Sequence, residues 1–208
     1  MDCTNVEINC NVEENIKQAA MDVFLKNGLK GARMQEIADM AGINRAMLHY
    51  YFGNKEKLFE LIFSEVTCKM QKRLTKILLS KLPLKEKIET FIEHFIEDAI
   101  ENPYFDVFFI NEFTKHPALM HRILLTKEKE TAFNHFKLEI ETAVARKEIK
   151  PSVNADMVIM NMISLCAYPF IGKAMMQSVF HMTENEYKTF IKQRVPVVQE
   201  MVVKSVFE

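Results

Sequence analysis

Residues 37–59 read IADMAGINRAMLHYYFGNKEKLF and contain the turn signals that organise the first part of the chain. A brief helix is expected over residues 34–40, and Gly42 supplies the tight turn that follows it. Asn44 is a suitable N-cap for a second helix that ends at about Tyr51. Two short helices joined by a glycine-containing turn form a helix-turn-helix, whose second helix enters the major groove of DNA.

A longer helix precedes this motif and completes a small domain. Residues 1–12 are polar and are expected to form a flexible tail. After them the apolar positions follow the i, i+3, i+4 spacing of a surface helix, at Ile16, Ala19, Ala20, Val23 and Phe24. Asn27-Gly28 ends that helix. The sequence therefore predicts a helix-turn-helix domain over residues 13–58.

Glycine is distributed unevenly and separates this domain from the rest of the chain. The 208 residues include only five glycines, and four of them lie in the 26 residues from Gly28 to Gly53. The remainder lacks the regular turn signals of a β-sandwich. Long helices are expected there instead, at residues 55–78, 84–101, 103–115, 119–147, 154–178 and 183–206. The predicted fold is all-α, with the three-helix N-terminal domain followed by a larger helical domain over residues 59–208.

Charge is also distributed unevenly. The window of residues 26–57 holds six basic and three acidic side chains, a net charge of +3, whereas the whole chain has a net charge of −1. A polyanion such as double-stranded DNA is therefore expected to meet this window.

Several other classes of protein and site are disfavoured. Scattered cysteines predict reduced thiols and a cytoplasmic location. The longest uncharged run, residues 157–172, is short for a membrane span, so no membrane partner is expected. The chain has no glycine-rich phosphate loop, nucleophile elbow or HExxH motif, so neither an enzyme nor a cofactor is expected. Glu112 and His116 have i, i+4 spacing and His121 follows, but isolated pairs of this kind are usually solvated, and no metal is expected.

Four groups of residues follow one another at fixed spacing across the motif. They are Ile37-Ala38, Ala41-Gly42-Ile43, Leu48-His49-Tyr50-Tyr51-Phe52 and Asn54-Lys55-Glu56-Lys57-Leu58-Phe59. Together they resemble the signature of TetR-family transcriptional regulators, over about residues 16–63. The resemblance implies a homodimer in which each N-terminal domain binds half of a palindromic operator and each C-terminal domain binds an effector.

The candidate DNA-binding residues lie on and beside the second helix of the motif. Arginine can donate two hydrogen bonds to guanine, and basic or aromatic side chains near the groove can donate to phosphates. The resemblance implies that Arg45 and Ala46 read bases. It also implies that Arg33, Met47, His49 and Lys55 contact phosphates, although His49 and Met47 depart from the residues usual in the family. The full candidate set is Arg33, Asn44, Arg45, Ala46, Met47, His49, Tyr50 and Lys55.

The C-terminal domain is rich in phenylalanine and methionine, which suits two interpretations. These side chains can line an apolar cavity for a small lipophilic effector, or they can simply fill the helical core. The candidate effector-binding residues are Phe91, Phe95, Phe109, Phe136, Met162 and Cys166, with His94 and His135 as polar handles.

The last two predicted helices carry more apolar residues than one subunit is expected to bury. A symmetric four-helix dimer interface accounts for this excess, and a monomer with a large internal core is the alternative. The candidate interface residues are Val158, Met162, Leu165, Tyr187, Phe190, Ile191, Val198, Met201 and Val202. The sequence thus predicts a ligand-responsive repressor released from DNA by a small apolar effector. An activator of the same architecture and a helical interaction module without DNA binding are the alternatives.

Overall fold

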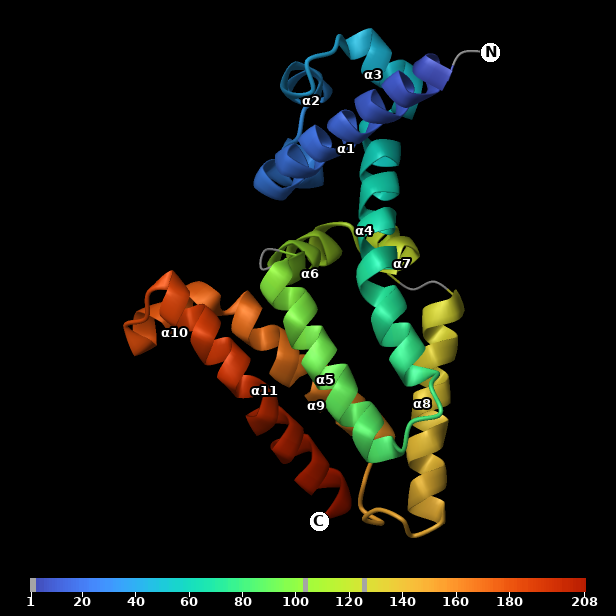
Figure 1. Cartoon of the computed structure of the whole chain (residues 1–208), viewed down its shortest axis with the longest axis vertical. Helices are drawn as coiled ribbons and strands as arrows, with labels where there is room; N and C mark the ends of the chain where they lie inside the picture. The colour runs from blue at the N-terminus through green and yellow to red at the C-terminus, as the bar shows by residue number, and fades with distance from the viewer. Residues whose placement is uncertain (1–2, 103–104, 125–126) are drawn as a thin grey trace. The chain divides into compact units, whose positions relative to one another are not determined.

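The computed structural model describes residues 3–102, 105–124 and 127–208, and all the regular elements in these ranges are α-helices (Figure 1). Their bounds are α1 Cys3–Gly31, α2 Met34–Met40, α3 Arg45–Phe52, α4 Lys55–Leu78, α5 Leu84–Glu101, α6 Phe105–Lys115, α7 Pro117–Leu124, α8 Lys127–Ala145, α9 Ala155–Ile171, α10 Lys173–Phe180 and α11 Glu184–Phe207. The predicted all-α fold is therefore confirmed.

Two of the predicted long helices are wrong, because each is divided in the structure. Residues 119–147 contribute to both α7 and α8, and residues 125–126 between them lie outside the described part of the chain. Residues 154–178 contribute to α9 and α10, which meet at Gly172 and are bent by 71°. Residues 3–12, expected in a tail, form the start of α1; their flexibility stays a prediction.

The chain folds into two compact units that do not follow the order of the sequence. Unit 1 comprises Met1–Cys68 together with Phe108–Leu124, and unit 2 comprises Lys69–Val107 together with Leu125–Glu208. The domain boundary predicted after residue 58 falls inside α4, whereas the units divide within the same helix ten residues later.

Unit 1 is built on a cluster of phenylalanines. Phe24 of α1 and Phe59 and Phe63 of α4 are completely buried. Phe63 stacks on Phe108 of α6, with ring centroids 4.5 Å apart and ring planes 10° from parallel. Aromatic rings bury a large apolar area, so this cluster is what joins α6 to the N-terminal helices.

Unit 2 has its own core, in which α5 packs against α9 and α11 and α8 packs against α9. Lys87 of α5 is 1% exposed and forms an ion pair with Glu139 of α8. A buried ammonium needs such a partner, because desolvation of an unpaired charge is costly. Among the described residues no single helix is long and apolar enough to cross a membrane; by length and composition alone, the bent α9–α10 pair could.

Candidate nucleic-acid interface

The turn between α2 and α3 is shaped by backbone hydrogen bonds around Gly42. The amide of Ile43 donates to the carbonyl of Ala38 at 3.0 Å, and the amide of Gly42 donates to Asp39 at 3.2 Å. Gly42 has a φ of 68°, in the left-handed region that glycine adopts without strain. This closed turn sets the direction in which α3 leaves α2.

Helix α3 is capped at its start and anchored by one side chain. The side-chain oxygen of Asn44 accepts a hydrogen bond from the amide of Met47 at 2.8 Å, as predicted for an N-cap. Leu48 is completely buried and holds the helix against the unit, while Arg45, Ala46 and His49 are exposed. Asn44 therefore acts first on the helix itself, and its contact with DNA stays a prediction.

The outer face of α3 also presents an aromatic side chain. Tyr50 is 86% exposed and lies edge-on to Tyr51, with ring centroids 5.5 Å apart. A side chain this exposed does not close the core of unit 1. Tyr50 is thus available to a partner of α3, as are the exposed Arg33 and Met47.

Lys55 differs from the other candidates because its ammonium is engaged within the protein. Its Nζ donates to the carbonyl of Lys30 at 3.3 Å and to the carbonyl of Ala32 at 3.1 Å. Asn54, rather than Lys55, makes the side-chain cap of α4, accepting from the amide of Lys57 at 2.8 Å. Lys55 therefore ties the start of α4 to the α1–α2 connection, a role that the sequence did not indicate.

Glu112 of α6 was expected to be solvated, and this interpretation is wrong. Its side chain is 2% exposed and lies in unit 1, where it accepts a hydrogen bond from the amide of Leu29. No cluster of three or more metal-ligating side chains occurs in the described part of the chain. The unusual position of a glutamate within the apolar run of α6 was the available sign of its burial.

The candidate effector-binding residues do not all come together. Phe91, Phe136 and Met162 line one small space in unit 2 that leaves no room for even a water molecule, and Cys166 is buried in the same core. Ligand pockets commonly measure about 300–1,000 Å³, so this space is closed to a drug-sized molecule. Phe95 is only partly buried and lies 6.0 Å from Phe91 between ring centroids.

Phe109 is grouped separately from the other candidates, in the core of unit 1, and its contact with an effector stays a prediction. It lies 6.1 Å from Phe63 between ring centroids and packs edge-on. The apolar residues around Phe109 did not indicate to which of the two units this part of α6 belongs.

Most of the candidate dimer-interface residues lie inside the chain rather than on its surface, contrary to the prediction. Six are buried inside the single chain and build the core of unit 2: Val158, Met162, Tyr187, Ile191, Val198 and Val202. Leu165 and Phe190 are partly buried, and only Met201 is well exposed, at 52%. Other large apolar side chains on the same helices are exposed instead, namely Met157, Met160 and Tyr168 of α9 and Val197 of α11.

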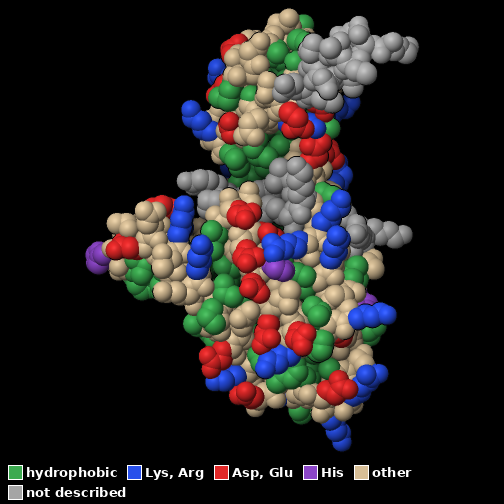
Figure 2. All heavy atoms as spheres, in the orientation of Figure 1, with side chains coloured by type: hydrophobic (Ala, Val, Ile, Leu, Met, Phe, Trp, Pro, Cys, Tyr) green, Lys and Arg blue, Asp and Glu red, His purple; other side chains and the backbone are tan. Residues whose placement is uncertain are grey.

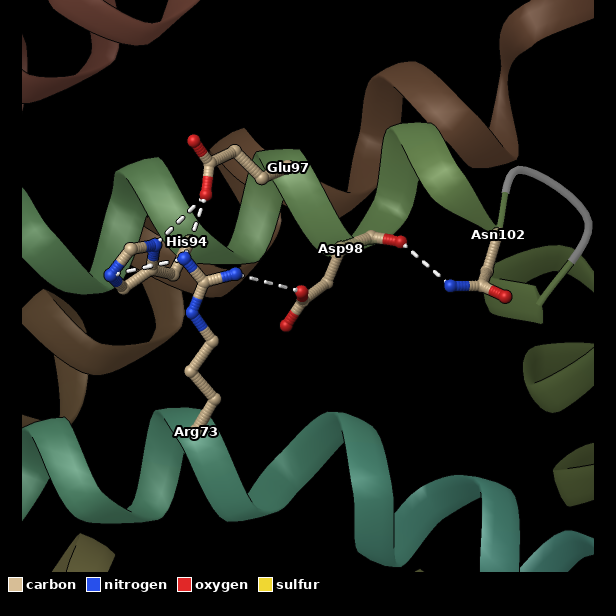
Figure 3. A network of polar contacts seen from close by, with 5 residues as sticks. All are labelled: Arg73, His94, Glu97, Asp98 and Asn102. Atoms are coloured by element: carbon tan, nitrogen blue, oxygen red, sulfur yellow. Dashed lines mark hydrogen bonds and ion pairs between the residues drawn. The ribbon is translucent and has the colours of Figure 1, made fainter.

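A network of polar side chains joins α4 to α5 within unit 2 (Figure 3). Arg73 of α4 donates to Glu97 at 3.0 Å and to Asp98 at 3.3 Å, and His94 lies 2.9 Å from the same Glu97 carboxylate. The hydrogen bond with His94 lowers the pKa of the Glu97 carboxyl, whereas burial raises the pKa of the Asp98 carboxyl. His94 is thus part of a surface network, which argues against its predicted role as a polar handle in an apolar pocket.

Acidic side chains extend this network along the exposed side of α5, where Figure 2 shows them in a row beside basic side chains. The exposed glutamates of this helix include Glu93, Glu97 and Glu101, spaced four residues apart. This surface of unit 2 is therefore unsuited to DNA, in contrast to the basic window of unit 1.

Comparison with known proteins shows where the chain has relatives. The family profile "Bacterial regulatory proteins, tetR family" matches residues 16–62. The HTH-type transcriptional repressor NicS of Pseudomonas putida is 43% identical over 53 residues, which is 26% of this chain and 25% of NicS. The chain thus matches about a quarter of the length of that relative.

Two further comparisons extend beyond the N-terminal helices. The HTH-type transcriptional regulator YhgD of Bacillus subtilis is 23% identical over 150 residues, covering 65% of this chain and 71% of YhgD. The crystal structure of the transcriptional regulator FadR from Bacillus subtilis, in complex with stearoyl-CoA, aligns over 92% of this chain and 97% of FadR. Its TM-score is 0.67 at 17% identity. At this identity the structural match shows the fold alone.

Proposed function

We propose that the chain, whose residues 16–62 match the profile of the tetR family of bacterial regulatory proteins, is a member of that family and acts as a homodimeric transcriptional repressor released from a palindromic operator by an apolar effector. The observation that carries the proposal is the exposed face of α3. This helix is capped by Asn44, anchored by Leu48 and otherwise turned outward, with Arg45 and Ala46 in its first turn. Such an arrangement suits entry of the N-terminal end of α3 into a major groove.

Arg45 is proposed to read a base, and Arg33 and His49 to hold the flanking phosphates. Arg45 is exposed and free to form two parallel hydrogen bonds with guanine. Arg33 lies at the start of α2, where its backbone is extended. Phosphate contacts orient the domain and base contacts select the sequence. A repressor of this kind acts on chromosomal DNA, so the proposal includes a cytoplasmic location.

The proposed dimer surface uses the exposed faces of α9 and α11. Met157, Met160 and Tyr168 of α9 are each about half exposed, as are Val197 and Met201 of α11. Because α9 packs against α11, a second copy of the same pair completes a four-helix bundle. This surface replaces the buried residues that the sequence suggested.

The proposed effector site is the apolar region around Phe91, Phe136 and Met162. In the described conformation the space between these side chains leaves no room for a ligand, so an effector must stabilise a more open conformer. A ligand shifts such an equilibrium only by its different affinity for the two conformers. FadR of Bacillus subtilis was crystallised with stearoyl-CoA, which supports an apolar chain as the chemistry to test first.

Selection of bound sequences from random double-stranded DNA tests the proposal, with sedimentation of the same protein as its companion. A palindromic consensus and a dimer are the expected results. Addition of stearoyl-CoA is then expected to lower the affinity for the selected sequence. A non-palindromic consensus or a monomer contradicts the dimeric mechanism, and recovery of no sequence favours an interaction module. An activator remains distinguishable, because its deletion lowers expression of the regulated gene.

A further inference from the structure

Glu112 of α6 occupies a buried position against the last turn of α1. The Oε2 atom of its carboxylate accepts a hydrogen bond from the backbone amide of Leu29 at 3.2 Å. Lys115 lies 3.6 Å from Oε1, and the Nε2 atom of His116 lies 3.9 Å from Oε2. His116 Nε2 is itself buried without a hydrogen-bond partner. The carboxylate therefore accepts from a backbone amide of α1 and has near it Lys115, at the end of α6, and His116, which follows that helix.

The backbone of α1 next to Glu112 leaves room for its carboxylate at Gly28. Gly28 interrupts the helical geometry of α1, with φ 67° and ψ 173°. A Cβ atom at Gly28 would lie only 2.7 Å from Oε1 of Glu112, so any other residue at this position would displace the carboxylate from its present place. Gly28 thus serves two purposes, since it allows the left-handed backbone and leaves room for the carboxylate.

The same turn leads directly into the helix-turn-helix. Ala32 donates its amide to the carbonyl of Gly28 at 3.1 Å, and Lys55 of α4 binds the carbonyls of Lys30 and Ala32. Leu29 and Ala32 are buried. The position of α2 therefore depends on a turn that is held by side chains from both α4 and α6.

We propose that Glu112 is a positioning residue for DNA binding. It fixes the Gly28–Ala32 turn and thereby the orientation of α2 and α3, the DNA-reading helices. The inference rests on the proposed function. A shift of α6 moves the hydrogen-bond acceptor of Leu29, and the turn must follow or lose a buried partner.

Two conservative variants separate the hydrogen bond from the charge. Glu112→Gln removes the charge but keeps an oxygen within reach of the Leu29 amide. Glu112→Asp keeps the charge but is one methylene shorter, so its oxygens are withdrawn from that amide. Glu60→Gln is the matched control, because Glu60 forms an exposed ion pair with Arg122 in the same unit.

The first measurement is hydrogen exchange at the Leu29 amide, which needs no DNA. Exchange is expected to be about tenfold faster in Glu112→Asp, since loss of a hydrogen bond to a charged group corresponds to a factor of this order or more. Glu112→Gln keeps an acceptor without the charge, so its exchange rate is expected to lie between those of the wild type and Glu112→Asp. Glu60→Gln is expected to match the wild type. Unchanged exchange in Glu112→Asp would overturn the inference.

The second measurement is affinity for the selected palindrome and for versions with one base pair added to or removed from its centre. All variants are compared well below their unfolding temperatures. The wild type and Glu112→Gln are expected to discriminate between spacings about tenfold or more, because a fixed orientation of the DNA-reading helices permits one separation. Glu112→Asp is expected to lose most of this discrimination, which a loss of stability alone does not produce.

The two proposals fail in different ways. If the wild-type protein selects no DNA, the proposed function fails, whereas the exchange of Leu29 still reports on the contact. If the wild type discriminates between spacings and Glu112→Asp does so equally, the positioning role of Glu112 is refuted and the proposed function stands.

Discussion

The helix-turn-helix of unit 1 and the α9–α11 region of unit 2 differ in what determines their structure. In the former, the turn and the start of α3 coincide with local signals, namely the left-handed Gly42 and the Asn44 cap. In the latter, apolar residues surround the helices, and packing alone decides which of them face inward. Val198 is completely buried and Val197 beside it is 49% exposed. Local chemistry thus determines where helices begin and end, whereas their buried face is a property of the whole fold.

The largest expected effect comes from truncating the aromatic core of unit 1. Phe63→Ala removes a fully buried ring that stacks on Phe108 and is expected to cost about 3–5 kcal/mol of stability. Hydrogen exchange should lose protection in unit 1, and DNA binding should disappear, while sedimentation still shows a dimer. Phe136→Ala is the matched variant in the core of unit 2. Identical losses across both units in the two variants would show that the units unfold together.

A smaller effect, on DNA affinity, is expected from a change on the exposed face of α3. Arg45→Ala should cost about 1–3 kcal/mol of operator binding and relax the preference at one base position. Repeating the selection from random DNA with the variant measures both effects. Arg122→Ala removes a similarly exposed arginine of unit 1 and should leave the consensus intact. A uniform loss of affinity over all sequences would assign Arg45 to a phosphate instead.

Lys55 is expected to act through the fold rather than through the DNA. Lys55→Met keeps the aliphatic stem but removes the hydrogen bonds to Lys30 and Ala32, which should cost about 1 kcal/mol of stability. The dependence of DNA affinity on salt should keep its slope. Arg33→Met should instead reduce that slope by about one counterion. A reduced slope in Lys55→Met would restore Lys55 as a phosphate contact.

The smallest effect is expected in the polar network of unit 2. The pKa of Glu97 is lowered in the folded protein, so its carboxylate stabilises unit 2 above the ordinary pKa. This contribution is lost as the pH falls through the folded value. Because Glu97 is about half exposed, Glu97→Gln should cost at most about 0.5 kcal/mol at neutral pH. Thermal unfolding measures this difference in stability between the wild type and Glu97→Gln, which should vanish in acid. A difference that grows as the pH falls contradicts the lowered pKa of Glu97.

Much of unit 1 could be predicted from the sequence because its signals are local. The bounds of α2 and the caps of α3 and α11 follow from a few neighbouring residues. The engagement of Lys55 could not be predicted in this way, since its acceptors lie 23 and 25 residues earlier in the chain. A lysine beside a DNA-binding motif has the same local appearance in either role.

The candidate sites of unit 2 were less predictable for the same reason. Phe91 and Phe136 are indeed neighbours, but Phe109, from the same phenylalanine-rich part of the sequence, belongs to unit 1. The interface residues were predicted from their hydrophobicity, and the residues of a core are hydrophobic as well. Only the exposed fraction of each side chain separates the two, and this depends on helices distant in the sequence.

The division of unit 1 into two stretches of chain has a consequence for its synthesis. When residues 1–68 have left the ribosome, Phe63 lacks the ring on which it stacks and the Leu29 amide lacks the carboxylate that binds it. Both partners arrive with residues 108–124, some forty residues of unit 2 later. Unit 1 therefore stays incomplete until part of unit 2 has emerged, so unit 1 cannot finish folding before synthesis of unit 2 has begun.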